Sequence, residues 1–181
     1  MNTSLNRTIQ ITNSLSGDQY RLVPLHEISP TKERLQEVQA ICNEPLIYQW
    51  CFKDLCKGNP YPEKLALDWF QWAKSGWEED SHYVYAVLDP NEKIAAACDI
   101  KSSNREHAEV GYWARSSHRG IMTNAVSALI ELAKDADFIN LFADIHPENQ
   151  KSLAVIKRCG FIETDRPSTY EGHISHDLKL A

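Results

Sequence analysis

Three apolar runs separated by short polar turns constrain the fold more than any other feature of this sequence. The runs cover residues 82–88, 93–101 and 108–114. Asp89, Pro90 and Asn91 lie between the first two, and these residue types favour turns. Apolar runs of this length joined by turns of a few residues are typical of an antiparallel meander. The sequence therefore predicts three consecutive antiparallel strands in the middle of the chain.

Helical periodicity flanks this meander on both sides. Ser29 is the expected N-cap of the first helix, with Pro30 at its first position, because Ser at the cap and Pro at N1 favour a helix start. The predicted helices cover residues 30–43, 62–77, 120–135 and 149–158. Further strands are predicted at residues 19–25, 138–145, 161–164 and 176–180. Strands and helices that alternate in this way indicate a mixed α/β domain.

The length of 181 residues is typical of one domain. Residues 1–18 are rich in Asn, Ser and Thr and have no apolar period, so we expect a flexible tail followed by one domain over residues 19–181. The net charge is −6, which argues against a nucleic-acid partner. The sequence contains no run of about 18 apolar residues, so it predicts no membrane-spanning helix. The five cysteines lack metal-ligand spacing, which predicts reduced thiols, no metal and a cytoplasmic protein.

A loop rich in polar and basic residues follows the third apolar run. It contains Arg115, His118, Arg119 and Gly120, and a helical pattern begins directly after it. A helix N-terminus presents free N–H groups and the positive end of a dipole, which suit a phosphate group. An ordinary helix start explains the same residues equally well, because a single glycine is a weak phosphate signal.

A second segment, residues 145–161, begins another helix. Asn149 is placed to cap this helix, Ser152 follows one turn later on the same side, and Gly160 is placed to end it. A capped helix describes this segment fully when it is taken alone.

Taken together, residues 108–161 resemble the GNAT superfamily of acyl-CoA-dependent N-acetyltransferases. Within it, AEVGYW, GIMTNAVSALIELA and HPENQKSLAVIKRCGF are most similar to the ribosomal-protein N-terminal acetyltransferases, the RimJ/RimL-like branch. The resemblance implies a GNAT fold, with a central mixed, mostly antiparallel sheet that splays apart and is flanked by helices. It also implies that acetyl-CoA enters the splay along residues 108–114. The implied cofactor-binding residues are Trp113, Ala114, Arg115, His118, Arg119, Gly120, Ile121, Met122, Thr123, Asn149 and Ser152.

The phosphate loop departs from the family pattern of R/Q-x-x-G-x-G/A. Aligned from the helix side, Ser117 stands at the Arg/Gln position and Met122 at the last small position. A frame that starts at Arg115 restores the arginine but places His118 at the first glycine. We adopt the first frame because it keeps the register of the helix.

Two carboxylates are the candidate acid–base groups. Glu109 lies in an apolar strand, where desolvation would raise its pKa, and it resembles the glutamate that serves as base in several GNAT enzymes; a glutamate that faces solvent is the alternative. An odd-length turn centred on Asn104 would place Asp99 directly opposite Glu109, so that the pair shares a proton. An even-length turn would send the two side chains to opposite faces.

The group that protonates the departing thiolate is less clearly marked. Many GNAT enzymes carry a tyrosine at the position of Ile156, so Ser152 is the remaining candidate for a hydrogen bond to the thiolate. Tyr170, in a late loop, is a further alternative.

The resemblance implies an acetyl-CoA-dependent N-acetyltransferase, with acetyl-CoA as cosubstrate. The expected acceptor is an amine, either a protein N-terminal α-amine or a small molecule, and we expect a monomer or a homodimer. A CoA-binding or ligand-sensing domain without catalytic activity is the rival interpretation.

Overall fold

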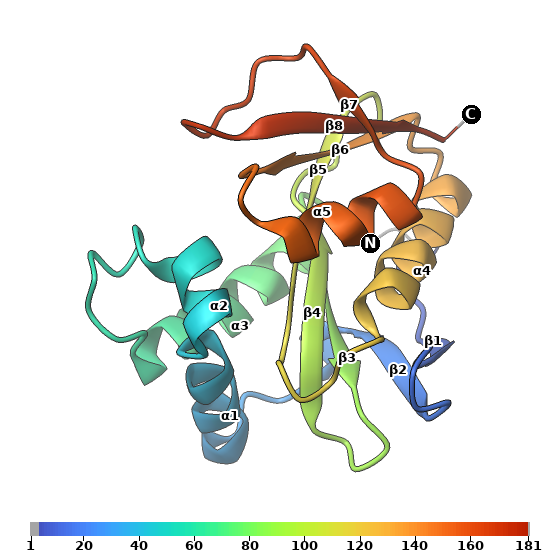
Figure 1. Ribbon diagram of the computed structural model, residues 1–181. Coiled ribbons are helices and arrows are strands. Elements are labelled where there is room, and N and C mark those ends of the chain that lie inside the picture. Colours follow the sequence, from blue (N-terminus) through green and yellow to red (C-terminus); the bar gives the residue numbers. More distant parts are fainter. Residues whose placement is uncertain (1–3, 181) are drawn as a thin grey trace.

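One eight-stranded sheet runs through the computed structural model, which describes residues 4–180 (Figure 1). Its spatial order is β1-β2-β3-β4-β5-β6-β8-β7. Neighbouring strands are antiparallel except β5 and β6, which are parallel. The prediction of a mixed, mostly antiparallel sheet flanked by helices is therefore confirmed. The strands are β1 (Ile9–Thr12), β2 (Gln19–Pro24), β3 (Tyr83–Leu88), β4 (Ile94–Ile100), β5 (Ala108–Ala114), β6 (Asn140–Ile145), β7 (Ile162–Thr164) and β8 (Ile174–Lys179).

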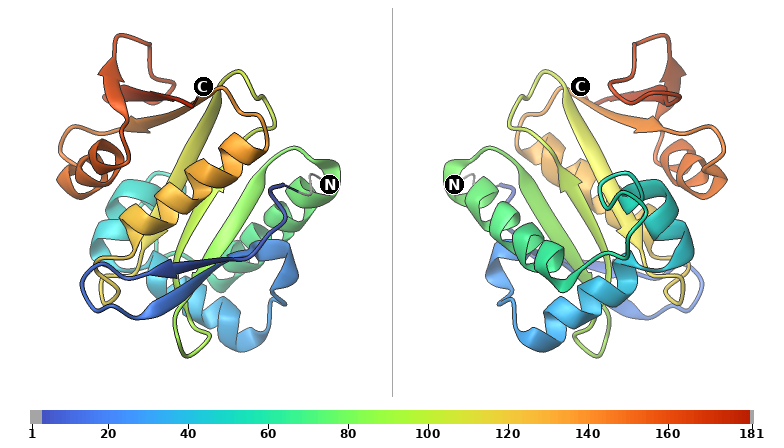
Figure 2. Two further views of the ribbon diagram at one scale, coloured as in Figure 1. Left: turned by 90° about the vertical axis from the view of Figure 1, so that its right-hand side faces the viewer. Right: turned by 90° about the vertical axis from the view of Figure 1, so that its left-hand side faces the viewer.

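Helices cover both faces of the sheet (Figure 2). α4 (Met122–Asp135) and α5 (Gln150–Arg158) contribute to one apolar core, whereas α1 (Lys32–Cys42) and α3 (Glu63–Glu79) pack in a second core on the opposite face. α2 (Pro45–Ile47) and the helical turns η1 (Leu25–Glu27) and η2 (Tyr48–Phe52) complete the described elements. Among them, no helix is long and apolar enough to cross a membrane.

The central strands are buried on both faces. In β3, Tyr83, Tyr85 and Val87 belong to the core under α4, whereas Val84 and Ala86 belong to the core under α1 and α3. Alternate residues of a strand point to opposite faces, so a strand between two helical layers needs apolar residues throughout. This explains the near-continuous apolar runs of the sequence.

Two helix starts differ from the prediction. α1 begins at Lys32 with Thr31 as N-cap, whose hydroxyl accepts a hydrogen bond from the Arg34 N–H at 3.4 Å. α4 begins at Met122, two residues later than predicted, and its N-cap Ile121 has no side chain that can accept a hydrogen bond. The first shift moves only a boundary, but the second leaves the N–H groups of a helix start without a side-chain cap.

The prediction of a flexible tail is corrected for residues 4–18, while residues 1–3 lie outside the described part of the chain. Leu5 is completely buried, and its carbonyl accepts a hydrogen bond from the Tyr85 hydroxyl at 2.7 Å. β1 pairs with β2, and Ile11 of β1 is also in the core. A short edge strand needs few apolar side chains, because one of its faces and one of its edges meet water. This is why the polar composition concealed it.

The register of the β4–β5 hairpin also differs from the prediction. Asp99 lies opposite Gly111, and the Lys101 N–H donates to the Glu109 carbonyl at 2.8 Å. The turn is therefore centred one residue later than Asn104, and the carbonyl of Arg105 accepts a hydrogen bond from the Ile139 N–H before β6. Asp99 and Glu109 share a face, but they are not directly opposite one another.

Removing the buried side chain of Leu5 should destabilise the whole fold. Leu5→Ala is expected to lower the free energy of unfolding by about 2–5 kcal/mol, the usual cost of truncating a buried leucine. Leu55→Ala is the matched control, because the Leu55 side chain is exposed and should change stability by less than about 0.5 kcal/mol. Equal denaturant midpoints for the two variants would show that residues 4–8 do not contribute to the core.

Candidate functional site

The sheet opens between β5 and β6. These strands pair only at Ala108 with Leu141 and at Glu109 with Phe142. Beyond these pairs β5 stays on β4 as far as Ala114, whereas β6 stays on β8, and the two halves of the sheet diverge (Figure 2). The splay that the resemblance implied therefore begins directly after Glu109.

A cavity of about 450 Å³ occupies this opening. Strands β4 and β5 form one wall, and residues near the end of β6, the start of α5 and the loop before β8 form another. Aromatic side chains from η2 and α3 line the remaining side. The wall residues that carry functional groups are Asp99, Lys101, Glu109, Tyr112, Trp113, Asp144, His146, Asn149, Ser152 and Tyr170.

Glu109 is held by a cation and a phenol in this cavity. Its Oε1 lies 2.5 Å from the Nζ of Lys101, the residue directly after β4, whose backbone N–H also donates to the Glu109 carbonyl. The Tyr170 hydroxyl lies 3.2 Å and 3.3 Å from the two oxygens of the same carboxylate. The nearest charged partner of Glu109 is therefore a cation and not Asp99. This corrects the prediction of two directly opposed carboxylates that share a proton.

Asp99 lies beside this pair, and its Oδ1 accepts a hydrogen bond from the Gly111 N–H at 3.0 Å. Burial raises the pKa of Asp99 against the opposing effect of Lys101, and the nearby Glu109 carboxylate raises it further. For Lys101, burial would lower the pKa, but the carboxylates of Asp99 and Glu109 outweigh burial and raise it. Lys101 is therefore the fixed positive charge of the cluster at neutral pH.

The start of α5 brings two further polar groups to the cavity, and one of them meets a tyrosine of β5. Asn149 caps the helix, and its Oδ1 accepts a hydrogen bond from the Ser152 N–H at 3.2 Å. The Ser152 Oγ lies 2.8 Å from the hydroxyl of Tyr112 on β5. Burial raises the pKa of Tyr112 above its ordinary value, so this phenol keeps its proton. Ser152 and Tyr112 together form a neutral hydrogen-bonding pair.

The loop predicted to bind phosphate is anchored at both ends. Glu44 accepts a hydrogen bond from the Ser116 N–H at 2.7 Å and lies 3.6 Å from the Nε of Arg115. At the other end, the Asn13 side chain donates to the Arg119 carbonyl at 3.0 Å. Within residues 4–180, no acceptor is found for the N–H groups of Arg119 and Gly120. These groups and the uncapped start of α4 can receive an anion.

The other residues predicted in this region contribute mainly through their backbone. The side chains of Ile121 and Met122 are buried. The His118 Nδ1 lies 2.8 Å from the hydroxyl of Tyr20, and the Thr123 carbonyl lies 3.6 Å from a cysteine sulfur. The side chains of Ile121 and Met122 are therefore not available to a phosphate, and the Nδ1 of His118 is already engaged.

Gly120 has a structural reason for being glycine. Its φ is +93°, in the left-handed region that disfavours side chains. A Cβ at this position would lie 2.5 Å from the Asn13 Oδ1 and 2.7 Å from the Leu15 Cγ. The close approach is made by the β1–β2 turn, so a larger residue here would disturb the fold as well as any bound phosphate.

The comparisons with known proteins agree with this geometry. A family model for the acetyltransferase (GNAT) domain matches residues 26–162. The chain belongs to the GNAT acetyltransferase family. No curated protein matches the chain. The family membership confirms an acetyltransferase, as the motifs predicted.

Solved structures with the same fold include two ribosomal-protein acetyltransferases. RimJ of Mycobacterium smegmatis, solved with a CoA disulfide, is 18% identical with a TM-score of 0.72, and the match covers 99% of this chain and 90% of that one. RimL, a ribosomal L7/L12 α-N-protein acetyltransferase solved with CoA, is 16% identical with a TM-score of 0.70, covering 94% and 98%. The microcin C7 self-immunity acetyltransferase MccE, solved with acetyl-CoA and AMP, is 18% identical with a TM-score of 0.68, covering 88% and 92%.

The structure brings most of the predicted residues to one place. Glu109, Asp99, Trp113, Asn149 and Ser152 line the cavity, and residues 115–123 form the adjoining loop and helix start. The lining residues that sequence reasoning missed include Lys101, Tyr112 and Asp144. Lys101 lies two positions after Asp99, at strand spacing, which was the one available signal. In the described part of the chain, no group of three His, Cys, Asp or Glu side chains could hold a metal ion.

Asn149→Ala should weaken both the helix and the cavity wall. Loss of an N-cap costs about 1 kcal/mol of stability, and the Ser152 N–H loses its acceptor. Because α5 lies at the cavity, acetyl-CoA affinity measured by calorimetry should fall as well. Thr31→Ala is the control, since it removes the cap of α1 outside this cavity. If both variants lose stability and neither loses affinity, Asn149 is only a helix cap.

Proposed function

We propose that this protein transfers the acetyl group of acetyl-CoA to an N-terminal α-amine of a protein or peptide. The observation that carries the proposal is the position of Glu109 at the point where β5 and β6 part. A carboxylate has about four lone-pair sites, and two donors, Lys101 and Tyr170, contact this one. Glu109 therefore keeps an accepting position toward the cavity.

Glu109 is the proposed general base. An acceptor ammonium gives a proton to the Glu109 carboxylate, and the resulting amine nitrogen attacks the thioester carbonyl carbon. The tetrahedral intermediate collapses, the carbon–sulfur bond breaks, and the second proton of the attacking nitrogen passes to the departing sulfur, so that the products are an amide and the CoA thiol. Lys101 balances the charge of the carboxylate before transfer. Ser152, on the wall formed by α5, shares a hydrogen bond with the Tyr112 hydroxyl, and this neutral pair can supply one donor to the oxygen or sulfur that gains charge.

The backbone of β5 supports the placement of acetyl-CoA along the opening. The Lys101 N–H donates to the Glu109 carbonyl, and the Arg115 N–H donates to the Ala95 carbonyl. The backbone groups of the odd-numbered residues of β5 therefore face β4. The alternate residues, including Tyr112, then direct their N–H and C=O groups toward the gap. Pantetheine carries amides that can pair with such groups, and the pyrophosphate would lie on the N–H groups of Arg119 and Gly120.

The acceptor side of the cavity is aromatic and acidic. Trp50, Trp69 and Trp72 line it together with Asp54. Indole faces and carboxylates attract an ammonium group, so a protonated amine is the favoured acceptor. An amine of a small molecule would satisfy the same groups, and it is the second candidate. The fold shared with RimJ and RimL supports the protein α-amine first.

An acceptor panel tests the function directly. Acetyl-CoA-dependent thiol release would be measured with N-terminal peptides, the same peptides with blocked α-amines, and small amines such as spermidine. Release with free peptides alone supports the proposal, and release with small amines alone replaces it with the second candidate. Acetyl-CoA binding without release from any acceptor would contradict catalysis and leave a ligand-binding domain.

Glu109→Gln should lower kcat by about 10²- to 10⁴-fold, the usual contribution of a general base. Asp99→Asn should keep most of the activity, because Asp99 is bound to the Gly111 N–H and is not the proposed base; the measurement is the pH–rate profile of the wild type and of each variant. Glu106→Gln is the control, as an exposed glutamate in the same hairpin. Full activity and an unchanged profile in Glu109→Gln would exclude Glu109 as the base.

A further inference from the structure

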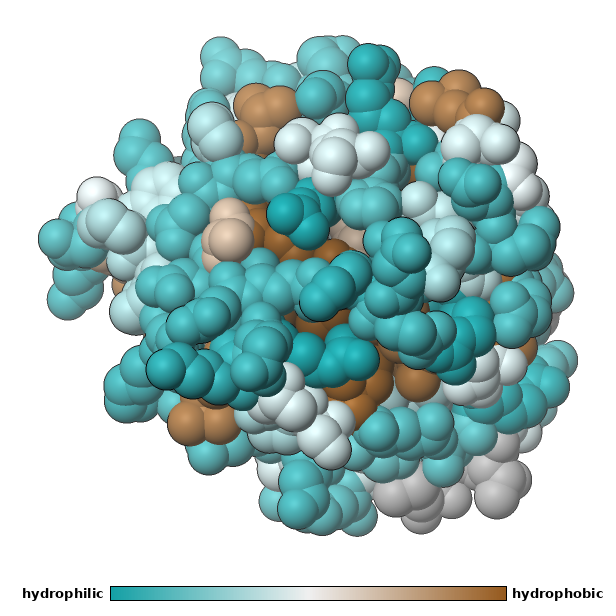
Figure 3. All heavy atoms as spheres, turned by 90° about the horizontal axis from the view of Figure 1, so that it is seen from below, coloured by the Kyte–Doolittle hydropathy of each residue, from teal (hydrophilic) through white to brown (hydrophobic). Residues whose placement is uncertain are grey.

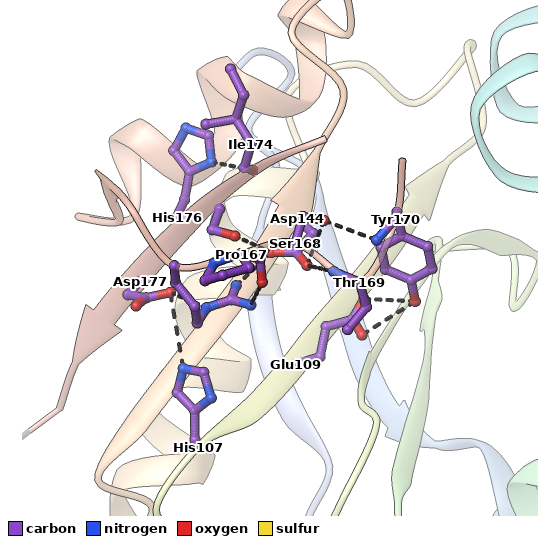
Figure 4. Close-up of polar contacts among 12 residues, drawn as sticks. His107, Glu109, Asp144, Pro167, Ser168, Thr169, Tyr170, Ile174, His176 and Asp177 are labelled. Carbon is purple, nitrogen blue, oxygen red and sulfur yellow. Dashed lines mark hydrogen bonds and ion pairs between the residues drawn. The ribbon is translucent and has the colours of Figure 1, made fainter. Parts of the chain in front are cut away.

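The loop over residues 165–173, between β7 and β8, borders the cavity with Tyr170 and His173 and is here called the strap. It carries Tyr170, whose hydroxyl points to the carboxylate of Glu109 on β5 (Figure 4). Tyr170 is 43% exposed, so burial alone does not fix this side chain. Its place over Glu109 depends on what holds the strap.

A buried carboxylate holds the strap in place. The side chain of Asp144, on β6, has no exposed surface. Its Oδ1 accepts hydrogen bonds from Arg166 at 2.5 Å and from the Ser175 hydroxyl at 3.0 Å. Its Oδ2 accepts hydrogen bonds from the Ser168 hydroxyl at 2.8 Å and the Thr169 N–H at 3.2 Å. Three of these four donors belong to the strap.

The carboxyl group of Asp144 stays ionised in this environment. Burial would raise its pKa, but the hydrogen bonds from Arg166, Ser168 and Ser175 outweigh burial and lower the pKa. Arg166 is braced in turn by Asp177, whose Oδ1 lies 3.2 Å from the Arg166 Nε, and it lies 4.0 Å above the ring of Phe142. The strap is therefore fastened to β6 and β8 by an ionised network.

Ser168 connects this network to Tyr170. Its hydroxyl donates to Asp144 and accepts a hydrogen bond from the Tyr170 N–H at 3.0 Å. Three hydrogen-bonding contacts in series thus join Asp144 to Ser168, Ser168 to the Tyr170 N–H, and the Tyr170 hydroxyl to Glu109. Ser175 makes the same kind of bond to Asp144 from β8, but it has no contact of this kind with Tyr170.

We propose that Asp144 and Ser168 are positioning residues, which fix the strap so that Tyr170 holds the carboxylate of Glu109 toward the acceptor. The inference rests on the proposed function, because its consequence for kcat requires Glu109 to be the base. Tyr170 also acts through Glu109 and is a positioning residue of the same chain.

The matched pair Ser168→Ala and Ser175→Ala tests this proposal. Each removes one hydroxyl bond to Asp144, but only Ser168 also contacts Tyr170. Ser168→Ala is expected to lower kcat about tenfold, the effect of one hydrogen bond of ordinary strength, with an unchanged KM for acetyl-CoA. Ser175→Ala should keep the wild-type kcat. Equal losses in the two variants would overturn the proposal, because general weakening of Asp144 would then explain them.

A double-mutant cycle with Tyr170→Phe adds a measurement that would not change if Ser168 had only a structural role. If Ser168 acts through Tyr170, Ser168→Ala should cost no further activity in the Tyr170→Phe background. Additive losses would contradict this route.

Amide hydrogen exchange makes the test independent of activity. The N–H groups of Thr169 and Tyr170 should exchange faster in Ser168→Ala and at the wild-type rate in Ser175→Ala. Unchanged exchange in Ser168→Ala would overturn the positioning role. An inactive wild type with the expected exchange pattern would contradict the proposed function and leave the strap geometry in place.

Discussion

The restriction of parallel pairing between β5 and β6 to two residue pairs is the constraint on which the rest of this structure depends. Each strand keeps a partner on its other side, β5 on β4 and β6 on β8, so the sheet opens without losing its cores. Backbone groups at such an opening need new partners. The cavity lies along this opening. So do the backbone N–H and C=O groups of Tyr112, which point toward the gap, and the uncapped start of α4. The molecule is mostly hydrophilic when viewed from below, with apolar side chains in hollows near the middle of that face (Figure 3).

The sequence predicted those elements whose burial produces a local pattern of apolar residues. β3 and β4 were found because a strand between two helical layers needs apolar residues at nearly every position. β1 and the residues before it were missed because the contribution of this segment to the core depends on Leu5, Ile11 and a few contacts with distant residues. The hairpin register was missed for a similar reason: the Ile139 N–H fixes the turn at Arg105, and no local pattern records a contact across 34 positions.

The candidate site was predictable where a motif carried it and obscure where topology assembled it. Glu109, Asn149 and Ser152 follow from segments that resemble the family. Tyr170 is 61 positions from Glu109, and it was named only as an alternative acid. The structure instead places its hydroxyl against the carboxylate of Glu109. Asp144 had no signal of its own, since one aspartate in an alternating strand is unremarkable until its four donors converge on it.

Asp144 and Glu109 show how one cavity gives two carboxylates different tasks. Asp144 accepts four hydrogen bonds and has no exposed side-chain surface, so its accepting capacity is filled. A carboxylate in that state can neither take a proton from a substrate at low cost nor turn toward one. Glu109 is 16% exposed and meets two donors, which orient it without filling it. The saturated carboxylate therefore fixes the architecture, and the unsaturated one is left for chemistry.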